Sequence, residues 1–442
     1  MSSGVRNKGL VLIAVLWMVV VLMVIAAATG QKCRLDTRVR VLGTEEVRCR
    51  WACRAGVESA VAVLNEDFRT SDSLADLWSD NLEDFNDVVL EGCRFTAEVF
   101  DEAGKLNINT ASSEQLMQLD NMTEDIVDAI LDWRDGDDNP RSDGAEQGYY
   151  QNLPYDYPIR NGPFKTIREL LLVKGVNEQL LYGEDTNFNR LLDYNEKDGD
   201  KSPPPDDGDD ELDRGWIAYM TCYSYDKNVD AMGNEKVNIN EADEGKLQES
   251  LNIDKPHAKW IVENRKDDGY KSIADLIRKG SEKEPKETSD GDSDRATPLD
   301  LQTFKQIADK ITVDKEDQVI GRVNVNTAPK VVLAALLGED ESAERIADGI
   351  IAYREGLLAG MESIGDLLNA ESVGVEDFKK LAAQVTTRSD VFTVRCFATA
   401  ERGDSSGLTL QTEAVVDRSS RPCQIVYWYE GPTPYLASYE KQ

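Results

Sequence analysis

The chain has 442 residues, enough for two or three domains, and 40% of them are hydrophobic, which is enough for packed cores and argues against a disordered chain. Its 83 acidic and 50 basic residues give a formal charge of −33, which opposes nucleic-acid binding and suits calcium or basic partners. The single histidine, His257, excludes a histidine-based catalytic triad and a multi-histidine zinc site within one chain.

The apolar segment at residues 10–29 contains no charged residue and is long enough to span a bilayer. It is longer than the apolar part of a secretory signal, about 7–15 residues, although Ala26, Ala27 and Ala28 would suit a cleavage site. Four basic residues follow the segment and favour a cytoplasmic position for what comes after it, but long domains cross membranes largely regardless of such bias. A cleaved signal, a plain anchor and a retained, reused segment are all compatible with these residues.

No proline interrupts residues 10–66, so we predict one long helix that leaves the membrane and continues into a soluble domain. Steps of three and four residues place one stripe on this helix, rich in small residues and suited to packing on a sheet. The stripe comprises Val47, Trp51, Ala55, Ser59 and Ala62. Cys49 and Cys53 are interpreted as small packing residues. The chain has seven cysteines, so export would leave at least one unpaired, and the pairing stays open.

Strand patterns occur near both ends of the chain. Phe95, Ala97 and Val99 alternate with more polar neighbours, and three β-like runs follow one another closely at residues 390–400, 407–418 and 423–430. We therefore predict an α+β protein in which the long N-terminal helix packs on a small antiparallel sheet, with residues 104–385 inserted as a large helical region.

Within the predicted insertion, three units near residues 104–176, 236–278 and 321–369 repeat one pattern. Each has an Asn-x-Asn, then a helix, a second helix ending in arginine, and a third segment. The asparagine pairs are Asn107/Asn109, Asn238/Asn240 and Asn324/Asn326. We interpret them as helix caps and turn residues that satisfy backbone groups. Two acidic, proline-containing stretches, 198–214 and 281–298, are predicted to be solvated and mobile linkers.

The repeated unit resembles the helix-hairpin-helix module of competence-type DNA receptors, in which a Gly-hydrophobic-Gly turn presents backbone amides to a phosphate. Here the first two turns lack glycine, and in the third Gly338 is followed by Glu339, Asp340 and Glu341. Acidic turns repel phosphate. We therefore expect no nucleic acid as a partner and interpret the repeats as a structural scaffold.

The sharpest local motif, "DTNFNRLLDYNE", has the ligand spacing of an EF-type calcium loop. The predicted Ca²⁺ ligands are Asp185, Asn187, Asn189, the carbonyl of Leu191, Asp193 and Glu196. Arg190 occupies the turn position normally held by glycine, which needs a positive φ and costs about 1 kcal/mol for another residue. The alternative is an acidic turn without metal.

A second acidic cluster, in "DWRDGDDNPRSDGAEQGYY", offers Asp135, Asp137 and Glu146 as a possible further Ca²⁺ site. A solvated acidic loop explains the same residues equally well.

Taken together, the order of segments resembles the type IV pilin-like proteins, and within them protein K of the general (type II) secretion pathway, a large minor pseudopilin. The resemblance rests on "RNKGLVLIAVLW", "DWRDGD…GAEQGYY", "NGPFKTIREL" and "VNVNTAPKVVL". It implies a leader at residues 1–9, a transmembrane half-helix at 10–29, a pilin-like helix and first strands at 30–103, the insertion at 104–385, and a C-terminal β meander at 386–442.

The resemblance further implies that a prepilin peptidase cuts after Gly9, so that the mature chain begins at Leu10, is N-methylated and keeps its apolar segment. The glutamate common at the fifth mature position of pilins is replaced by Ala14, as is typical of protein K. The implied location is the inner membrane, with a single pass and a periplasmic bulk, and Ca²⁺ supports the fold of the insertion.

The function that follows from the resemblance is assembly without catalysis: the subunit caps the pseudopilus tip with minor pseudopilins I and J and supports export across the outer membrane. No phosphate loop or nucleophile–base pair indicates an enzyme. The alternative is a minor tip subunit of a type IV or DNA-uptake pilus with a calcium-dependent adhesive role or, with less support, a DNA-binding role.

Overall fold

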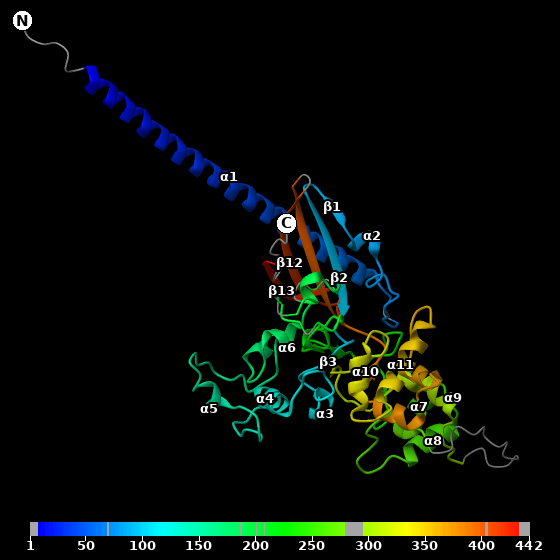
Figure 1. Cartoon of the computed structure of the whole chain (residues 1–442). Coiled ribbons are helices and arrows are strands. Elements are labelled where there is room, and N and C mark those ends of the chain that lie inside the picture. Colours follow the sequence, from blue (N-terminus) through cyan, green and yellow to red (C-terminus); the bar gives the residue numbers. More distant parts are fainter. Residues whose placement is uncertain are drawn as a thin grey trace, which may run out of the picture.

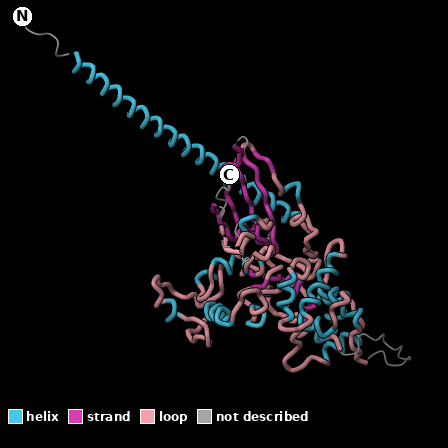
Figure 2. The backbone as a smooth tube through the Cα atoms, viewed as in Figure 1, coloured by secondary structure: helices cyan, strands magenta, loops and turns pink. Residues whose placement is uncertain are grey.

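The computed structural model describes residues 8–68, 70–185, 188, 190–199, 201–202, 204–206, 208–278, 295–402 and 405–432. A very long helix ends on an antiparallel sheet, and a larger region of short helices and loops lies beyond one end of that sheet (Figures 1 and 2). The mixed α+β class, the long N-terminal apolar helix and the small antiparallel sheet agree with the prediction.

Helix α1 (Lys8–Glu66) is continuous over 59 residues, or about 90 Å at 1.5 Å per residue. Its first half projects away from the body (Figure 1), and residues 10–44 are exposed throughout. By length and composition α1 could cross a membrane. The absence of proline allows the same helix to pass from this projecting half into the folded body.

The main sheet has the strand order β1-β2-β11-β12-β13, and every neighbouring pair is antiparallel. Its strands are β1 (Val88–Leu90), β2 (Cys93–Asp101), β11 (Val391–Arg402), β12 (Ser405–Asp417) and β13 (Gln424–Pro432); the short α2 (Leu82–Phe85) precedes β1. In β2 the alternate residues from Cys93 to Asp101 are buried, as the sequence alternation predicts. The C-terminal strands form the predicted meander. Almost 290 residues separate β2 from its partner β11 along the chain. The two strands can therefore pair only after the whole insertion has been synthesised.

The face of α1 that packs on the sheet differs from the predicted stripe. The buried residues are Cys49, Ala52, Cys53, Gly56, Val57, Ala60 and Leu64. Val47 and Trp51 are 51% and 66% exposed, so the prediction for that stripe is wrong. The reason is steric: a Cβ on Gly56 would lie 2.5 Å from Cys396 Sγ, so the helix approaches too closely for a tryptophan on this face.

A separate hydrophobic core fills the insertion. Its helical segments are α3 (Ser113–Leu116), α4 (Glu124–Arg134), α5 (Gln147–Tyr150), η1 (Ile167–Leu172), α6 (Glu178–Tyr182), η2 (Tyr194–Glu196), η3 (Trp216–Ala218), α7 (Glu244–Leu251), α8 (Lys255–Glu263), η4 (Ile273–Leu276), α9 (Leu301–Ile307), η5 (Ala308–Lys310), α10 (Lys330–Leu337), α11 (Ala343–Glu355), η6 (Ile364–Asn369) and α12 (Val375–Leu381).

Three parallel pairs of two-residue strands bracket the repeated units. β3 (Leu106–Asn107) pairs with β4 (Met220–Thr221), β6 (Val237–Asn238) with β7 (Ile311–Thr312), and β9 (Val323–Asn324) with β10 (Val385–Thr386). A further antiparallel pair joins β5 (Tyr225–Asp226) to β8 (Val319–Ile320). Each unit therefore begins and ends at one short parallel ladder, with its helices between.

The second asparagine of each unit makes the same contact. The side chain of Asn109 pairs with both backbone groups of Phe164, that of Asn240 with those of Tyr270, and that of Asn326 with those of Met361. The prediction that these asparagines satisfy backbone groups is confirmed. The prediction that they cap helices is wrong, because the N-caps that follow them are Ser112, Asp243 and Pro329. Assignment of the units as helix-hairpin-helix modules stays a prediction.

The acidic stretch 198–214 is not the wholly solvated linker that its composition indicates. Pro204 is buried, and Asp206 is 8% exposed. The carboxylate of Asp206 accepts hydrogen bonds from the backbone N–H groups of Asp198 (3.1 Å) and Gly199 (2.8 Å). These bonds fold the acidic stretch back on itself, which composition alone does not reveal. Most of the stretch 281–298 lies outside the described residues.

Candidate calcium-binding sites

The structure brings the second predicted acidic cluster together. Asp135 follows α4, Asp137 lies two residues later, and Glu146 precedes α5 after the chain has turned back. One carboxylate oxygen from each of these residues lies within 4.8 Å of the others. The three side chains can therefore face a single cation.

A close backbone approach makes this return possible. A Cβ on Gly144 would lie 1.9 Å from Oδ2 of Asp132, a fully buried carboxylate in the last turns of α4. Lys174 Nζ holds the loop by donating to the carbonyl of Asp143 at 2.8 Å. Behind the loop, the rings of Trp133 and Tyr150 meet edge to face with centroids 5.1 Å apart. The glycine, the lysine and the aromatic pair together position Glu146 against the end of α4.

Glu146 is the member of this cluster that most clearly fits a cation. It is 6% exposed, and within the described part of the chain neither carboxylate oxygen has a hydrogen-bond partner. Burial, then the nearby carboxylates of Asp132 and Asp135, raise the pKa of Glu146 to about 7. A buried carboxylate without donors is costly, and Ca²⁺, which takes 6–8 oxygen ligands, would satisfy it.

The acidic residues of the EF-like loop are gathered less closely, since the carboxylate oxygens of Asp185, Asp193 and Glu196 do not all lie within 4.8 Å of one another. Asp185 and Glu196 are buried, and Arg190 N–H donates to Asp185 Oδ2 at 3.2 Å, while Asp193 N–H donates to Glu196 Oε2 at 2.9 Å. Oε1 of Glu196 is buried and has no hydrogen-bond partner among the described residues. Burial, together with the charges of Asp193 and Asp185, raises the pKa of Glu196 to about 7. Carboxylates of this kind are the ligands that a hard cation prefers. Of the other predicted ligands, Asn187 and Asn189 lie outside the described residues, whereas Leu191, whose carbonyl is the predicted ligand, lies within them.

Arg190 has φ of +57°, as its place at the glycine position of the loop predicts. Its side chain reaches the main sheet: the guanidinium lies 4.3 Å from the centroid of Phe100 and 3.8 Å from the carboxylate of Glu98. On the same sheet, Arg395 stacks between Phe100 (5.0 Å) and Phe188 of the loop (4.3 Å). The loop is thus docked on β2 and β11 by alternating cations and rings, a contact that loop spacing alone does not indicate.

A second contact between the insertion and the sheet is a buried ion pair. Arg168 of η1 donates to both carboxylate oxygens of Glu413 in β12, at 2.7 and 3.2 Å, and Arg395 donates to the same carboxylate at 3.3 Å. Burial would raise the pKa of Glu413, but Arg395 and Arg168 outweigh it and lower that pKa to about 2. Glu413 is therefore ionised and joins the two parts of the molecule.

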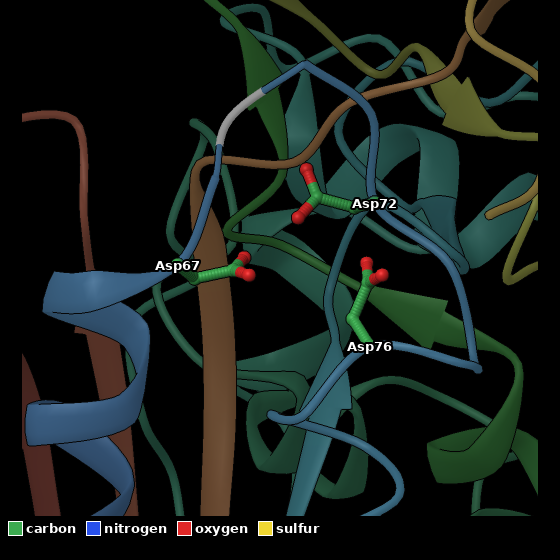
Figure 3. A group of neighbouring side chains, drawn as sticks. All are labelled: Asp67, Asp72 and Asp76. Carbon is green, nitrogen blue, oxygen red and sulfur yellow. The ribbon is translucent and has the colours of Figure 1, made fainter.

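A third acidic cluster, Asp67, Asp72 and Asp76, was not recognised in the sequence (Figure 3). Asp67 ends the turn after α1, and the other two lie in the following loop. Its charge is met by protein donors: the buried guanidinium of Arg418 donates to Asp67 at 2.6 Å and to Asp72, and Ser389 N–H donates to Asp72 at 2.8 Å. The cluster is therefore part of an ion-pair network, whereas the carboxylate of Glu146 has no hydrogen-bond donor among the described residues. Arg418 lies 346 residues from Asp72, so no local signal could have revealed it.

The predicted processing site lies at the start of the long helix. α1 begins at Lys8, directly before Gly9, and Leu10 is 74% exposed. The first apolar half of the helix contacts no other described element of the chain and forms an isolated rod. Such a rod can lie in a bilayer or against other helices.

Two segments match a protein-family model. Residues 99–182 and, separately, residues 323–388 match type II secretion system protein K. The first segment contains the first repeated unit and the cluster of Asp135, Asp137 and Glu146, and the second segment contains most of the third repeated unit. The resemblance to type II secretion protein K that the sequence predicts is confirmed in these two segments, and the matches support a minor pseudopilin of type II secretion.

Among solved structures, the chain is similar to one from the GspK–GspI–GspJ complex of the type 2 secretion system of enterotoxigenic Escherichia coli. The identity is 12%, the TM-score is 0.47, and the match covers 89% of this chain and 99% of that one. No curated protein matches by sequence. Together with the protein K matches, the one long apolar helix found among the described residues is consistent with anchoring in the inner membrane.

Proposed function

We propose that this chain caps the pseudopilus tip together with minor pseudopilins I and J, supports protein export across the outer membrane, and has no catalytic role. The observation that carries the proposal is the division of α1. Its first half is an exposed apolar rod, and its second half packs on a sheet that bears the large insertion. The rod would insert among other subunits' helices, while the bulk of the insertion leaves room for addition below it only.

Ala14 supports the position at the tip. A glutamate at the fifth mature residue is thought to help a pilin dock beneath the subunit above it, and a subunit at the tip has none above it. An alanine there also avoids placing a carboxylate in the bilayer, which is costly.

The outer face of α1 supports the choice of partners. Val47 and Trp51 remain 51% and 66% exposed beside the projecting rod, and exposed aromatic residues are common anchors in protein interfaces. The related structure named above contains GspK with GspI and GspJ. A helix from a neighbouring minor pseudopilin would cover this face.

Calcium enters the proposal as a structural ion. Glu146 with Asp135 and Asp137 would hold one Ca²⁺, and the loop with Asp185, Asp193 and Glu196 would hold another. Each ion would neutralise buried carboxylates and fix the surrounding loops of the insertion, in a periplasmic location. The supporting observation is that both sites contain a buried glutamate oxygen with no hydrogen-bond donor among the described residues.

The first test is the N-terminus of the membrane-bound protein, measured by mass spectrometry in cells with and without a prepilin peptidase. We expect a chain that begins at Leu10, carries an N-methyl group and depends on the peptidase. Gly9→Val should block the cut, and Gly4→Val, the matched control in the same leader, should not. A start near Thr29, or an uncut chain in the presence of the peptidase, would contradict the proposal.

The second test concerns the tip. Pseudopili are assembled with an epitope-tagged copy of this chain and labelled with gold-conjugated antibody, and a tagged major pseudopilin serves as the control. We expect label at fibre ends for this chain and along the whole fibre for the control. Label distributed along the fibre for both proteins would rule out a capping role.

A further inference from the structure

Four of the seven cysteines lie in the small core between α1 and the main sheet: Cys49, Cys53, Cys93 and Cys396. Within this group, Sγ of Cys49 on α1 lies 3.4 Å from Sγ of Cys93 at the start of β2, and both side chains are fully buried. A disulfide needs the two sulfur atoms about 2.0 Å apart. Rotation of the side chains can supply the difference of roughly 1.4 Å without separating the helix from the strand.

Cys53 is oriented differently. Its Sγ lies 3.6 Å from the backbone oxygen of Cys396 and 3.5 Å from that of Leu410, so its thiol can donate to carbonyl groups of the sheet. Cys93 and Cys396 lie on different strands and several residues apart along the sheet, since Cys93 pairs with Ala400 and Cys396 with Ala97. The side chains of Cys53 and Cys396 also interact with each other, so the core holds two pairs of neighbouring thiols. Of these, Cys49 and Cys93 join α1 to β2, with their sulfur atoms 3.4 Å apart.

We propose that Cys49 and Cys93 form a disulfide in the assembled protein. The inference rests on the proposed function in one respect, because it needs the folded part of the chain to lie in the oxidising periplasm. Cys49 is among the first buried residues as α1 enters the body. The bond would therefore link α1 covalently to the sheet at the point where the projecting half of the helix meets the folded body. Any force transmitted along α1 would act at this point.

The reaction is thiol–disulfide exchange with a protein disulfide oxidant. One cysteine thiolate attacks the oxidant's S–S bond, releases one oxidant thiolate and forms a mixed disulfide. The second cysteine attacks that mixed disulfide and releases the other oxidant thiolate. The two cysteine thiols are thereby oxidised to one disulfide, the oxidant is reduced to a dithiol, and the two cysteine protons end on it.

The timing follows from burial. In the folded protein, burial raises the pKa of the Cys49 thiol to about 12 and also raises that of Cys93, so little thiolate is present and the oxidant has no access. The bond would form while α1 is still undocked. The folded core would then protect it from reduction.

The test is peptide mapping of the full chain, taken from membranes into acid and alkylated to trap free thiols. Trypsin separates these three cysteines, because it cuts after the arginines at positions 48, 50, 54, 69 and 94. Cys49 then lies in peptide 49–50, Cys53 in peptide 51–54 and Cys93 in peptide 70–94. We expect peptide 49–50 joined to peptide 70–94, with a mass about 2 Da below the sum of the two thiols and loss of the joined species on reduction.

Two controls distinguish the inference from the proposed function. The full chain is also reduced, unfolded and refolded in detergent with oxidised glutathione, which supplies an oxidant without a periplasm. The joined peptide in both preparations supports the proposal. The joined peptide after refolding alone leaves the pairing geometry intact but overturns the bond in the cell and the periplasmic location on which it rests.

Alkylated Cys49 and Cys93 in both preparations, or peptide 51–54 joined to peptide 70–94, would overturn the proposed pairing. A stability readout completes the test. Wild-type chain that is reduced while unfolded and then refolded in reductant should have a midpoint temperature several degrees below that of the oxidised chain, because the bond closes a loop of more than 40 residues. The same treatment should leave the midpoint of the Cys49→Ser/Cys93→Ser double variant unchanged, and Cys33→Ser, at an exposed position on α1, should behave like the wild type.

Discussion

Replacing Glu146 with glutamine should change the stability of this protein in opposite directions with and without calcium. In the metal-free protein at pH 8, the buried charge of Glu146 opposes folding. A pKa raised from 4.5 to about 7 corresponds to roughly 3 kcal/mol of destabilisation when the group is ionised in both states. Because the folded pKa is the higher one, this cost is absent below pH 4.5 and complete above pH 7. Glu146→Gln should therefore raise the free energy of unfolding in EDTA at pH 8 by up to about 3 kcal/mol.

With calcium, the order should reverse. Calcium at 100 times its dissociation constant would stabilise the wild-type site by about 2.7 kcal/mol, and the neutral amide should lose most of that gain. The assay is urea unfolding of the full chain in detergent, followed by tryptophan fluorescence, since Trp133 is buried next to the cluster. Glu371→Gln, an identical change at an exposed site, should match the wild type in both conditions.

The EF-like loop would contribute equally to the wild type and to Glu146→Gln, so the difference between the two isolates the cluster. The reasoning would be refuted by either of two results. One is a variant that is less stable than the wild type in EDTA at pH 8. The other is a variant that keeps the whole calcium-dependent gain of the wild type.

Two further changes probe the sheet. Glu413→Gln should cost about 3–5 kcal/mol at pH 7, because it leaves Arg168 and Arg395 buried without their carboxylate. The lowered pKa of Glu413 also predicts that the free energy of unfolding of the wild type falls as the pH is lowered from 4.5 to 2. The urea midpoint of Glu413→Gln should fall less over this range. Equal falls in the two proteins would count against the ion pair between Glu413 and the two arginines. Gly56→Ala should destabilise by about 1–3 kcal/mol, since the added Cβ would lie 2.5 Å from Cys396 Sγ. Gly43→Ala, on the same helix with no atom within 4 Å, should be neutral or stabilising by up to about 1 kcal/mol, and equal effects of the two changes in thermal unfolding would contradict the packing argument.

Local sequence patterns were enough to predict several elements of the fold. The proline-free, charge-free start predicts a continuous helix, because nothing in it interrupts backbone hydrogen bonding, and α1 runs unbroken from Lys8 to Glu66. Strict alternation in residues 93–101 predicts β2, because side chains on a strand point to opposite faces. The three Asn-x-Asn repeats predict equivalent units, and their second asparagines make equivalent backbone contacts. The acidic residues that converge at Glu146 were also visible in the sequence, because they lie within twelve residues of one another.

Tertiary structure decided which surfaces meet. Hydrophobicity alone favours Trp51 as a packing residue, but α1 turns another face to the sheet, which comes so close at Gly56 that a Cβ there would lie 2.5 Å from Cys396 Sγ, and Trp51 stays exposed. The partners of Glu413, Asp72 and Arg190 come from distant segments, and no spacing rule connects them. Burial then sets their chemistry. A carboxylate among guanidinium groups, such as Glu413, stays ionised, whereas burial and neighbouring carboxylates raise the pKa of Glu146 to about 7, which is the basis for the proposed cation there. Sequence periodicity reports which residues share a face, but desolvation and charge pairing depend on what that face is pressed against.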